Sequence, residues 1–255
     1  IPNGLGLVWA CWAAVRLIRE GIRLTPTVHL VAAVLFLWTV RPPIAVVEGI
    51  CLAIGFWWAA FRWRRGRVVS VVALAVIWAA TVVLPGRAGV APGRFWLTKV
   101  EGQLDQLRSM QRGTASSTGS SYYLYDESSE IRGRTLDQAL RAIGKGWAYY
   151  LLAPFPWHVS TRLQVAAMPE MLLWYVLLLC GGVGGWVLCR RRPAETLVLL
   201  LTLVILTTLM ALSTGNIGVA FRHRGILVPL YLVFSAAGIG WLSRVGSRRR
   251  DASAL

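Results

Sequence analysis

The sequence predicts an all-α membrane protein, a polytopic transmembrane helical bundle of about seven spans with a mostly helical extracytoplasmic segment. Hydrophobic residues make up 56% of the 255 residues and charged residues only 15%. The mean hydropathy is +0.58, and a soluble core of this length does not need so much apolar surface. The apolar residues also form long runs between short arginine-rich links. Such runs are expected to be helical because an isolated span in lipid must satisfy its own backbone.

Residues 1–84 are expected to form the N-terminal membrane helices. The second run ends at the sequence Arg41-Pro42-Pro43, because consecutive prolines remove hydrogen-bond donors and fix the backbone. The first two runs are short for membrane spans. The four predicted spans are residues 4–18, 27–40, 44–61 and 68–84.

Residues 85–167 are predicted to be an extracytoplasmic segment, since they hold most of the acidic residues and no run long enough to span. Apolar residues at helical spacing predict an amphipathic helix over residues 94–111. A flexible loop at 113–121 and a short helix at 135–143 are expected after it. Residues 146–159 combine aromatics with two prolines, which favours an interfacial or re-entrant element.

Residues 168–242 are predicted to form the C-terminal membrane helices. The three spans are residues 168–189, 195–213 and 225–242. The spacing of Gly181 and Gly185 predicts a close approach by a neighbouring helix. Residues 243–255 are expected to be a basic cytoplasmic tail.

The basic links predict the orientation. Residues 62–67, 190–192 and the tail are all rich in arginine and belong inside by the positive-inside rule. Seven spans with the N-terminus outside and the C-terminus inside satisfy all of these links at once. The same arrangement places residues 85–167 and 214–224 outside.

The charge and the cysteines exclude other classes of protein. The formal charge of +16 comes from arginines that punctuate apolar runs, so membrane lipids, and not nucleic acid, are the expected partners. Cys11, Cys51, Cys180 and Cys189 lie within or at the ends of apolar runs, and none has the paired spacing of a metal site. We predict no metal site.

The stretch 214–224 is the strongest candidate site. We expect it to be an outer loop in which two glycines allow a tight turn around Asn216, and we expect Asn216, Arg222, His223 and Arg224 to bind the substrate. Arg222 and Arg224 flank His223, and fork-shaped guanidinium groups beside an imidazole suit a phosphate or pyrophosphate. The alternative is a membrane anchor whose arginines contact lipid phosphates.

Three motifs carry a resemblance to a known family. GNIGVAFRHR is followed by a span with an early proline, LLAPFPW occupies residues 151–157, and MPEMLLWY occupies residues 168–175. Together they resemble the C-terminal half of bacterial integral membrane proteins of polysaccharide and glycan assembly clusters, which are similar to polyprenyl-phosphate-dependent, GT-C-type glycosyltransferases. The resemblance covers residues 140–242. It implies an inner-membrane protein that handles a polyprenyl-phosphate-linked glycan at the outer face, with Arg222 and Arg224 as phosphate contacts and no resident cofactor.

One departure concerns catalysis. GT-C enzymes usually carry an acidic residue in the first outer loop, whereas the first complete outer loop here is Arg41-Pro42-Pro43. Either a catalytic half precedes Ile1 or the chain is not catalytic. Of the acids present, Glu170, Asp126 and Glu127 are placed to act, and each also fits an ordinary solvated carboxylate.

A second hypothesis comes from a different class, a non-catalytic accessory or scaffold subunit of a larger membrane complex. Short spans and many small residues favour contacts with partner subunits. Two titratable residues lie inside predicted spans, Glu48 and His29. A carboxylate within a span is a functional candidate by default, although Glu48 could also pair with Arg41. A lone histidine such as His29 could hold a pigment or haem, but it is more often a core residue.

Overall fold

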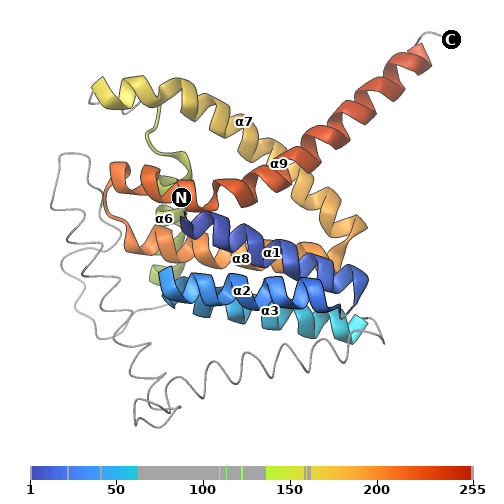
Figure 1. The fold of residues 1–255 in the computed structure, drawn as a ribbon. Coiled ribbons are helices and arrows are strands. Elements are labelled where there is room, and N and C mark those ends of the chain that lie inside the picture. Colours follow the sequence, from blue (N-terminus) through green and yellow to red (C-terminus); the bar gives the residue numbers. More distant parts are fainter. Residues whose placement is uncertain are drawn as a thin grey trace, which may run out of the picture. The chain divides into compact units, whose positions relative to one another are not determined.

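The structure is a computed structural model, and it describes residues 2–21, 23–40, 42–62, 109, 113, 122, 136–157, 159 and 162–253. Within these ranges every regular element is a helix. The helices are α1 (Pro2–Glu20), α2 (Leu24–Val40), α3 (Pro42–Arg62), α6 (Leu136–Leu152), α7 (Arg162–Arg191), α8 (Pro193–Ser213) and α9 (Ile217–Ser253). Figure 1 labels all of them.

The predicted all-helical class is confirmed over the described residues, and the apolar helices support the predicted membrane protein. Three helices are long and apolar enough to cross a membrane, over Gln164–Arg191, Pro193–Ser213 and Ile217–Val245. Leu24–Val40 and Ile44–Ala59 are shorter apolar helices. The predicted span 68–84 lies outside the described residues, and so do the helix 94–111 and the loop 113–121 apart from Ser109 and Gly113.

The chain forms two compact units. One comprises Ile1–Leu74, Leu172–Leu203 and Ile226–Leu255, and the other comprises Ala75–Met171 and Val204–Gly225. We call them the first and second units and describe each by itself. Helices α7, α8 and α9 each contribute one segment to the first unit and one to the second.

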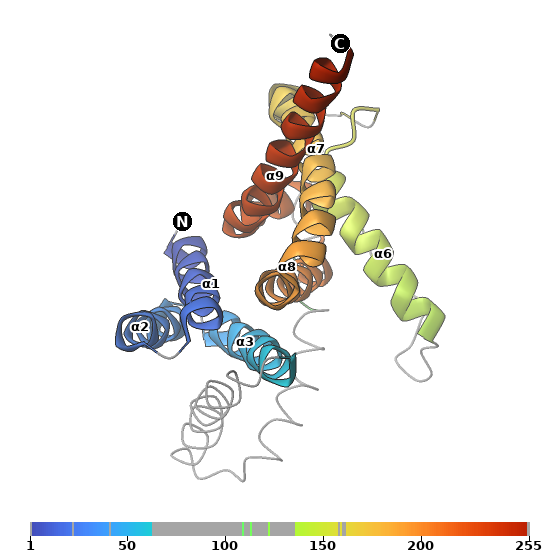
Figure 2. The ribbon, with the colours of Figure 1, turned by 90° about the vertical axis from the view of Figure 1, so that its right-hand side faces the viewer.

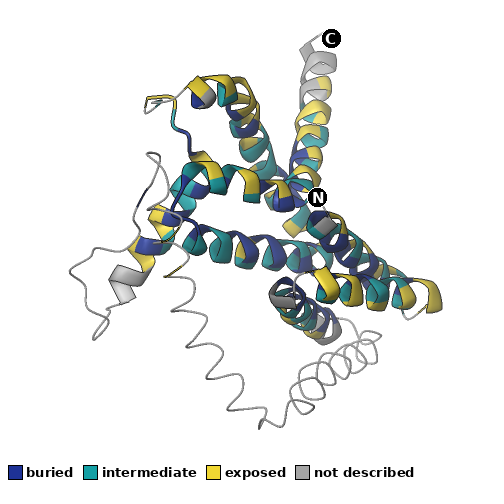
Figure 3. Ribbon diagram, turned by 60° about the vertical axis from the view of Figure 1, so that its left-hand side comes forward, coloured by how far each residue is buried: buried dark blue, intermediate teal, exposed yellow. Residues whose placement is uncertain are grey.

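In the first unit, α1, α2 and α3 pack on one another (Figures 1 and 2). Small residues allow this close packing, since an added Cβ at Gly6 would meet the Phe36 and Leu37 side chains of α2. Most helices carry both buried and exposed residues (Figure 3), as expected of helices that pack on one side. The buried cluster where α1, α3 and α8 meet comprises Ala14, Leu17, Ile18, Leu52, Phe56, Ala59, Ala194 and Val198.

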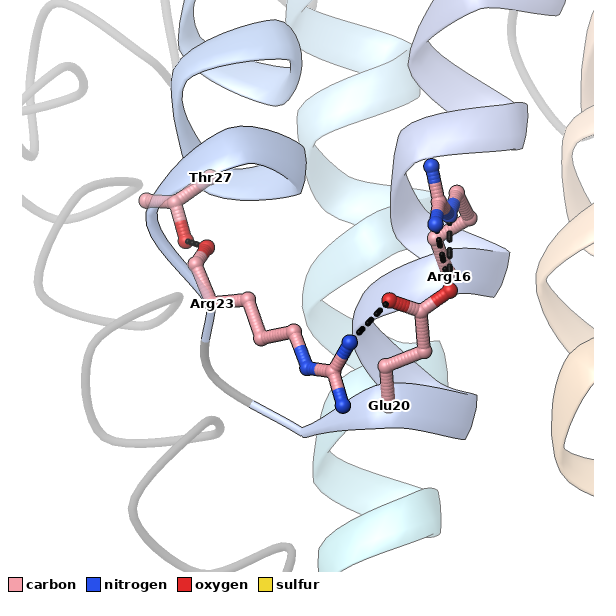
Figure 4. A network of polar contacts seen from close by, with 4 residues as sticks. All are labelled: Arg16, Glu20, Arg23 and Thr27. Carbon is pink, nitrogen blue, oxygen red and sulfur yellow. Dashed lines mark hydrogen bonds and ion pairs between the residues drawn. The ribbon is translucent and has the colours of Figure 1, made fainter.

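The link between α1 and α2 is a polar turn. Gly21 ends α1 with a φ of 77°, a left-handed conformation that glycine adopts without strain, and its N–H donates to the Leu17 carbonyl at 3.0 Å. Arg16 Nε donates to Glu20 Oε1 at 2.7 Å, and Arg23 Nη1 donates to Glu20 Oε2 at 3.3 Å (Figure 4). The hydrogen bond from Arg16 is the main reason that the pKa of Glu20 is lowered from its ordinary value.

The C-terminal parts of α7 and α9 cross at very short range in the first unit. An added Cβ on Gly184 would overlap the Phe234 carbonyl, and one on Gly238 would overlap the Cys180 carbonyl. Beside this crossing, Ser235 Oγ of α9 donates to the Leu177 carbonyl of α7 at 2.7 Å. The predicted close approach at the glycine cluster is confirmed, and its tightest point is Gly184 instead of the expected Gly181 and Gly185.

Several predicted boundaries are wrong. The last predicted span, 225–242, is part of α9, which continues to Ser253 through most of the predicted tail. The short helix at 135–143 and the first half of the broken stretch 146–159 form the single helix α6, which ends at Leu152. Aromatic residues do not interrupt a helix, whereas Pro154 removes a donor and restricts the residue before it, so the helix stops there. Residues 214–224 are not a loop, because α9 begins at Ile217 and contains the whole basic tripeptide.

Candidate functional site

Asn216 caps the first turn of α9 in the second unit. Its Oδ1 accepts hydrogen bonds from the N–H groups of Gly218 at 2.8 Å and Val219 at 3.4 Å. Its backbone carbonyl accepts from Ala220 N–H at 2.9 Å. Asparagine is a favoured N-cap residue because its side-chain oxygen satisfies donors that have no partner inside the helix. The buried Asn216 therefore fixes where α9 begins, and its role in substrate binding stays a prediction.

Arg222 and Arg224 lie on different faces of α9. Two helical residues that are two positions apart point about 200° away from each other around the axis. Accordingly Arg222 is exposed, His223 is half-buried, and Arg224 is only 4% exposed. The two guanidinium groups therefore do not bind one phosphate side by side, as was expected for a loop.

The Arg224 guanidinium holds the end of α6. Its Nε donates to the Tyr150 carbonyl and its Nη2 to the Ala153 carbonyl. Its Nη1 lies 3.1 Å from the Met171 Sδ atom of α7. The last carbonyls of a helix have no partner within it and carry partial negative charge, which a cation can satisfy. Arg224 thus joins the C-terminal end of α6 to α9 and to the start of α7.

Aromatic rings cover this junction. The Tyr122 ring stacks on the Tyr149 ring of α6 with 4.4 Å between centroids, and Phe155 meets Tyr149 edge-on at 5.4 Å. Tyr122 N–H also donates to the Gly215 carbonyl at 2.8 Å, immediately before the α9 cap. Burial raises the pKa of the Tyr122 phenol to about 12, so this ring stays neutral at physiological pH.

A second polar contact fastens α6 to α8. Trp147 Nε1 donates to Thr208 Oγ1 at 3.1 Å. One residue earlier, a Cβ added to Gly146 would lie 3.3 Å from the Ala211 carbonyl oxygen. The second unit is therefore built around α6, with Arg224, Tyr122 and Thr208 each contacting it.

The remaining candidate residues are spread over the chain. Glu170 is exposed on α7, and within the described ranges no ion pair or hydrogen bond joins it to the basic tripeptide. Asp126 and Glu127 lie outside the described residues. Among the residues described, no group of three or more His, Cys, Asp or Glu side chains could hold a metal ion. The structure thus brings together arginine, tyrosines and backbone carbonyls, and no catalytic pair of carboxylates within its described part.

His29 lies against two tryptophans in the first unit. Trp9 Nε1 donates to His29 Nδ1 at 3.2 Å, and the Trp12 ring meets the imidazole edge-on at 5.4 Å. Because the Nδ1 atom accepts a hydrogen bond, the neutral ring carries its proton on Nε2. These contacts show that His29 packs against two tryptophan side chains. Its use as a pigment or haem ligand stays a prediction.

Sequence reasoning missed the structural role of Arg224 and the participation of Tyr149 and Tyr150. The available signal was the spacing of Arg222 and Arg224, which puts them on different faces once the stretch is recognised as helical. Comparison of the chain with protein-family models, with curated proteins and with solved structures finds no match.

Proposed function

We propose that this membrane protein binds a lipid-linked phosphate, in particular a polyprenyl-phosphate-linked glycan, at the extracytoplasmic face of the bacterial inner membrane. The observation that carries the proposal is the exposure of Arg222 near the beginning of α9, where the long apolar stretch Ile217–Val245 starts. A cation at that level lies where the phosphate of a membrane-embedded lipid is expected. The resemblance of the motif GNIGVAFRHR to the glycan-assembly family also supports the proposal.

The chemistry of the site favours an anion. Arginine binds phosphate oxygens through two parallel N–H donors and keeps its charge at every physiological pH. Arg222 is exposed, and no ion pair joins it to another of the described residues. Arg224 supports the site indirectly, because it fixes α9 against α6.

The proposed topology has seven spans, with the N-terminus outside and the C-terminus inside. An ion pair in the first unit supports it, since Arg19 Nε at the end of α1 lies 3.0 Å from Glu195 Oε1 at the start of α8. Arg192 Nη1 also lies 3.5 Å from Glu195 Oε2. The link at the end of α1, which contains Arg19 and Arg23, therefore lies beside the link 190–192 that precedes α8, and the positive-inside rule assigns both to the cytoplasm.

A structural subunit of a larger membrane complex is the second candidate. One observation favours it, a row of exposed aliphatic side chains on α7 at Leu172, Leu173, Val176 and Leu179. Lipid tails or a partner helix could cover this row. The glycines of α7 are weaker evidence for contacts with a partner subunit than expected, because Gly181 and Gly184 already pack against α9 of the same chain.

The phosphate proposal predicts that Arg222→Ala weakens binding of undecaprenyl phosphate by about tenfold or more, the effect of losing one charge-assisted contact. Binding is measured by native mass spectrometry of the purified protein titrated with undecaprenyl phosphate. Undecaprenol, which has the same chain without the phosphate, should bind wild type and Arg222→Ala equally.

The matched control is Arg244→Ala, which removes an exposed arginine near the other end of α9 and should leave binding unchanged. Equal affinity of wild type and Arg222→Ala for undecaprenyl phosphate would refute the proposal. So would an equal loss in Arg244→Ala, because the attraction would then be general. Purification in a large hetero-complex with no lipid adduct would favour the structural subunit.

A further inference from the structure

Glu48 occupies a core position of the first unit. It lies on the face of α3 that also carries Leu52 and Phe56, one and two turns further on, and all three side chains are buried. The Glu48 side chain is 0% exposed. The apolar residues on this face of α3 predict an apolar side chain at position 48, but the residue there carries a carboxyl group.

Two helices provide its polar contacts. Thr202 of α8 donates from Oγ1 to Glu48 Oε2 at 2.8 Å, and Cys11 of α1 donates from Sγ to Glu48 Oε1 at 3.4 Å. These three residues belong to the first unit. Both carboxyl oxygens thus have a hydrogen-bonding neighbour, and the contacts tie α3 to α1 and α8.

Neither contact provides a counter-charge. Two described titratable groups interact with the carboxyl, the thiols of Cys11 on α1 and Cys51 on α3, both free and buried, while α8 presents the neutral hydroxyl of Thr202. Among the described residues no cation pairs with Glu48. Arg41, the alternative partner considered from the sequence, lies outside the described residues. An ionised carboxylate that is fully removed from water and unpaired is strongly disfavoured, and such a group takes up a proton instead.

The observed geometry suits a protonated carboxyl. A hydroxyl both donates and accepts, so the 2.8 Å separation also serves an acid O–H that donates to Thr202 Oγ1. The thiol of Cys11 then donates to the remaining carbonyl oxygen. A neutral Glu48 can donate to Thr202 Oγ1 and accept from Cys11 Sγ, whereas in the ionised form a full buried charge depends on two uncharged donors.

We propose that Glu48 is a proton-binding site inside the membrane bundle, at which a bound proton removes the charge that would otherwise lie between α3, α1 and α8. Release of this proton would leave a bare charge between the three helices. This site lies in the first unit and does not depend on the phosphate proposal. It gives the bundle a group through which protonation and helix packing are coupled.

The test is infrared difference spectroscopy of wild type and Glu48→Gln at neutral pH. We expect wild type to show the carbonyl stretch of a protonated carboxylic acid, shifted in heavy water, and the variant to lack it. The matched control is Glu20→Gln, because the lowered pKa of Glu20 keeps that group ionised. Its replacement should remove a carboxylate band and leave the acid band in place.

A second variant covers the case in which Glu48→Gln does not fold. Thr202→Val removes the hydroxyl but keeps the shape of the side chain, and it should shift the acid band to higher frequency because a hydrogen bond is lost. Loss of a carboxylate band in Glu48→Gln, or an acid band that Thr202→Val leaves unmoved, would overturn the proposal.

Discussion

Arg224→Met is expected to lower the free energy of unfolding by about 3 kcal/mol or more, because it removes two hydrogen bonds from a charged group, each worth about 1.5–3 kcal/mol. The variant keeps most of the side-chain volume and removes all the donors. The carbonyls of Tyr150 and Ala153 lose the N–H groups that satisfy them. Unfolding followed by tryptophan fluorescence in detergent measures the change, since Trp147 of α6 lies in the same unit.

Arg222→Met is the matched control, since it makes the same chemical change two residues earlier on an exposed face. It should alter the free energy of unfolding by no more than about 0.5 kcal/mol. Arg224→Lys should restore only part of the loss, because one ammonium group cannot reproduce the fork of a guanidinium. Equal destabilisation by Arg222→Met and Arg224→Met would contradict the assignment of the two arginines to different roles.

Gly184→Ala should destabilise the first unit, whereas Gly182→Ala should not. A Cβ at Gly184 would overlap the Phe234 carbonyl oxygen and lie 2.7 Å from the Gly238 backbone nitrogen. Both neighbours are backbone, so α7 and α9 would have to separate, and such overpacking costs about 1–3 kcal/mol. Thermal unfolding of the purified variants is the measurement.

Gly182 is a strict control for this prediction, because it lies in the same helix and a Cβ there would meet nothing within 4 Å. Alanine is favoured over glycine inside a helix by up to about 1 kcal/mol. The melting temperature of Gly182→Ala should therefore equal or exceed that of wild type. A Gly184→Ala protein as stable as wild type would show that the two helices are further apart than the structure has them.

The sequence was informative wherever a strong local signal decided the structure. Apolar runs predicted the helical membrane class, and the glycine cluster near residue 184 predicted a close crossing. The predicted helix boundaries were wrong where a residue type was expected to interrupt a helix. Aromatic residues after Gly146 continue α6, and the glycines on either side of Asn216 do not make a loop, because the asparagine starts a helix.

The candidate site could be predicted only in part. A pair of arginines near the end of an apolar run is visible in the sequence, and the exposure of Arg222 fits that reading. The burial of Arg224 depends on Tyr150 and Ala153, which are more than seventy positions earlier in the chain. Contacts of this kind come from tertiary packing, and no periodicity along the sequence predicts them.

The central claim is that the beginning of α9 and residues 85–167 face the outside of the cell. It is tested most directly by cysteine labelling in intact cells with a membrane-impermeant maleimide. Single cysteines replace Ser117 or Ser247 in a background without Cys11, Cys51, Cys180 and Cys189. The account predicts that the cysteine at Ser117 is labelled in intact cells and that the cysteine at Ser247 is labelled only after permeabilisation. Labelling at Ser117 only after permeabilisation would contradict an extracytoplasmic site.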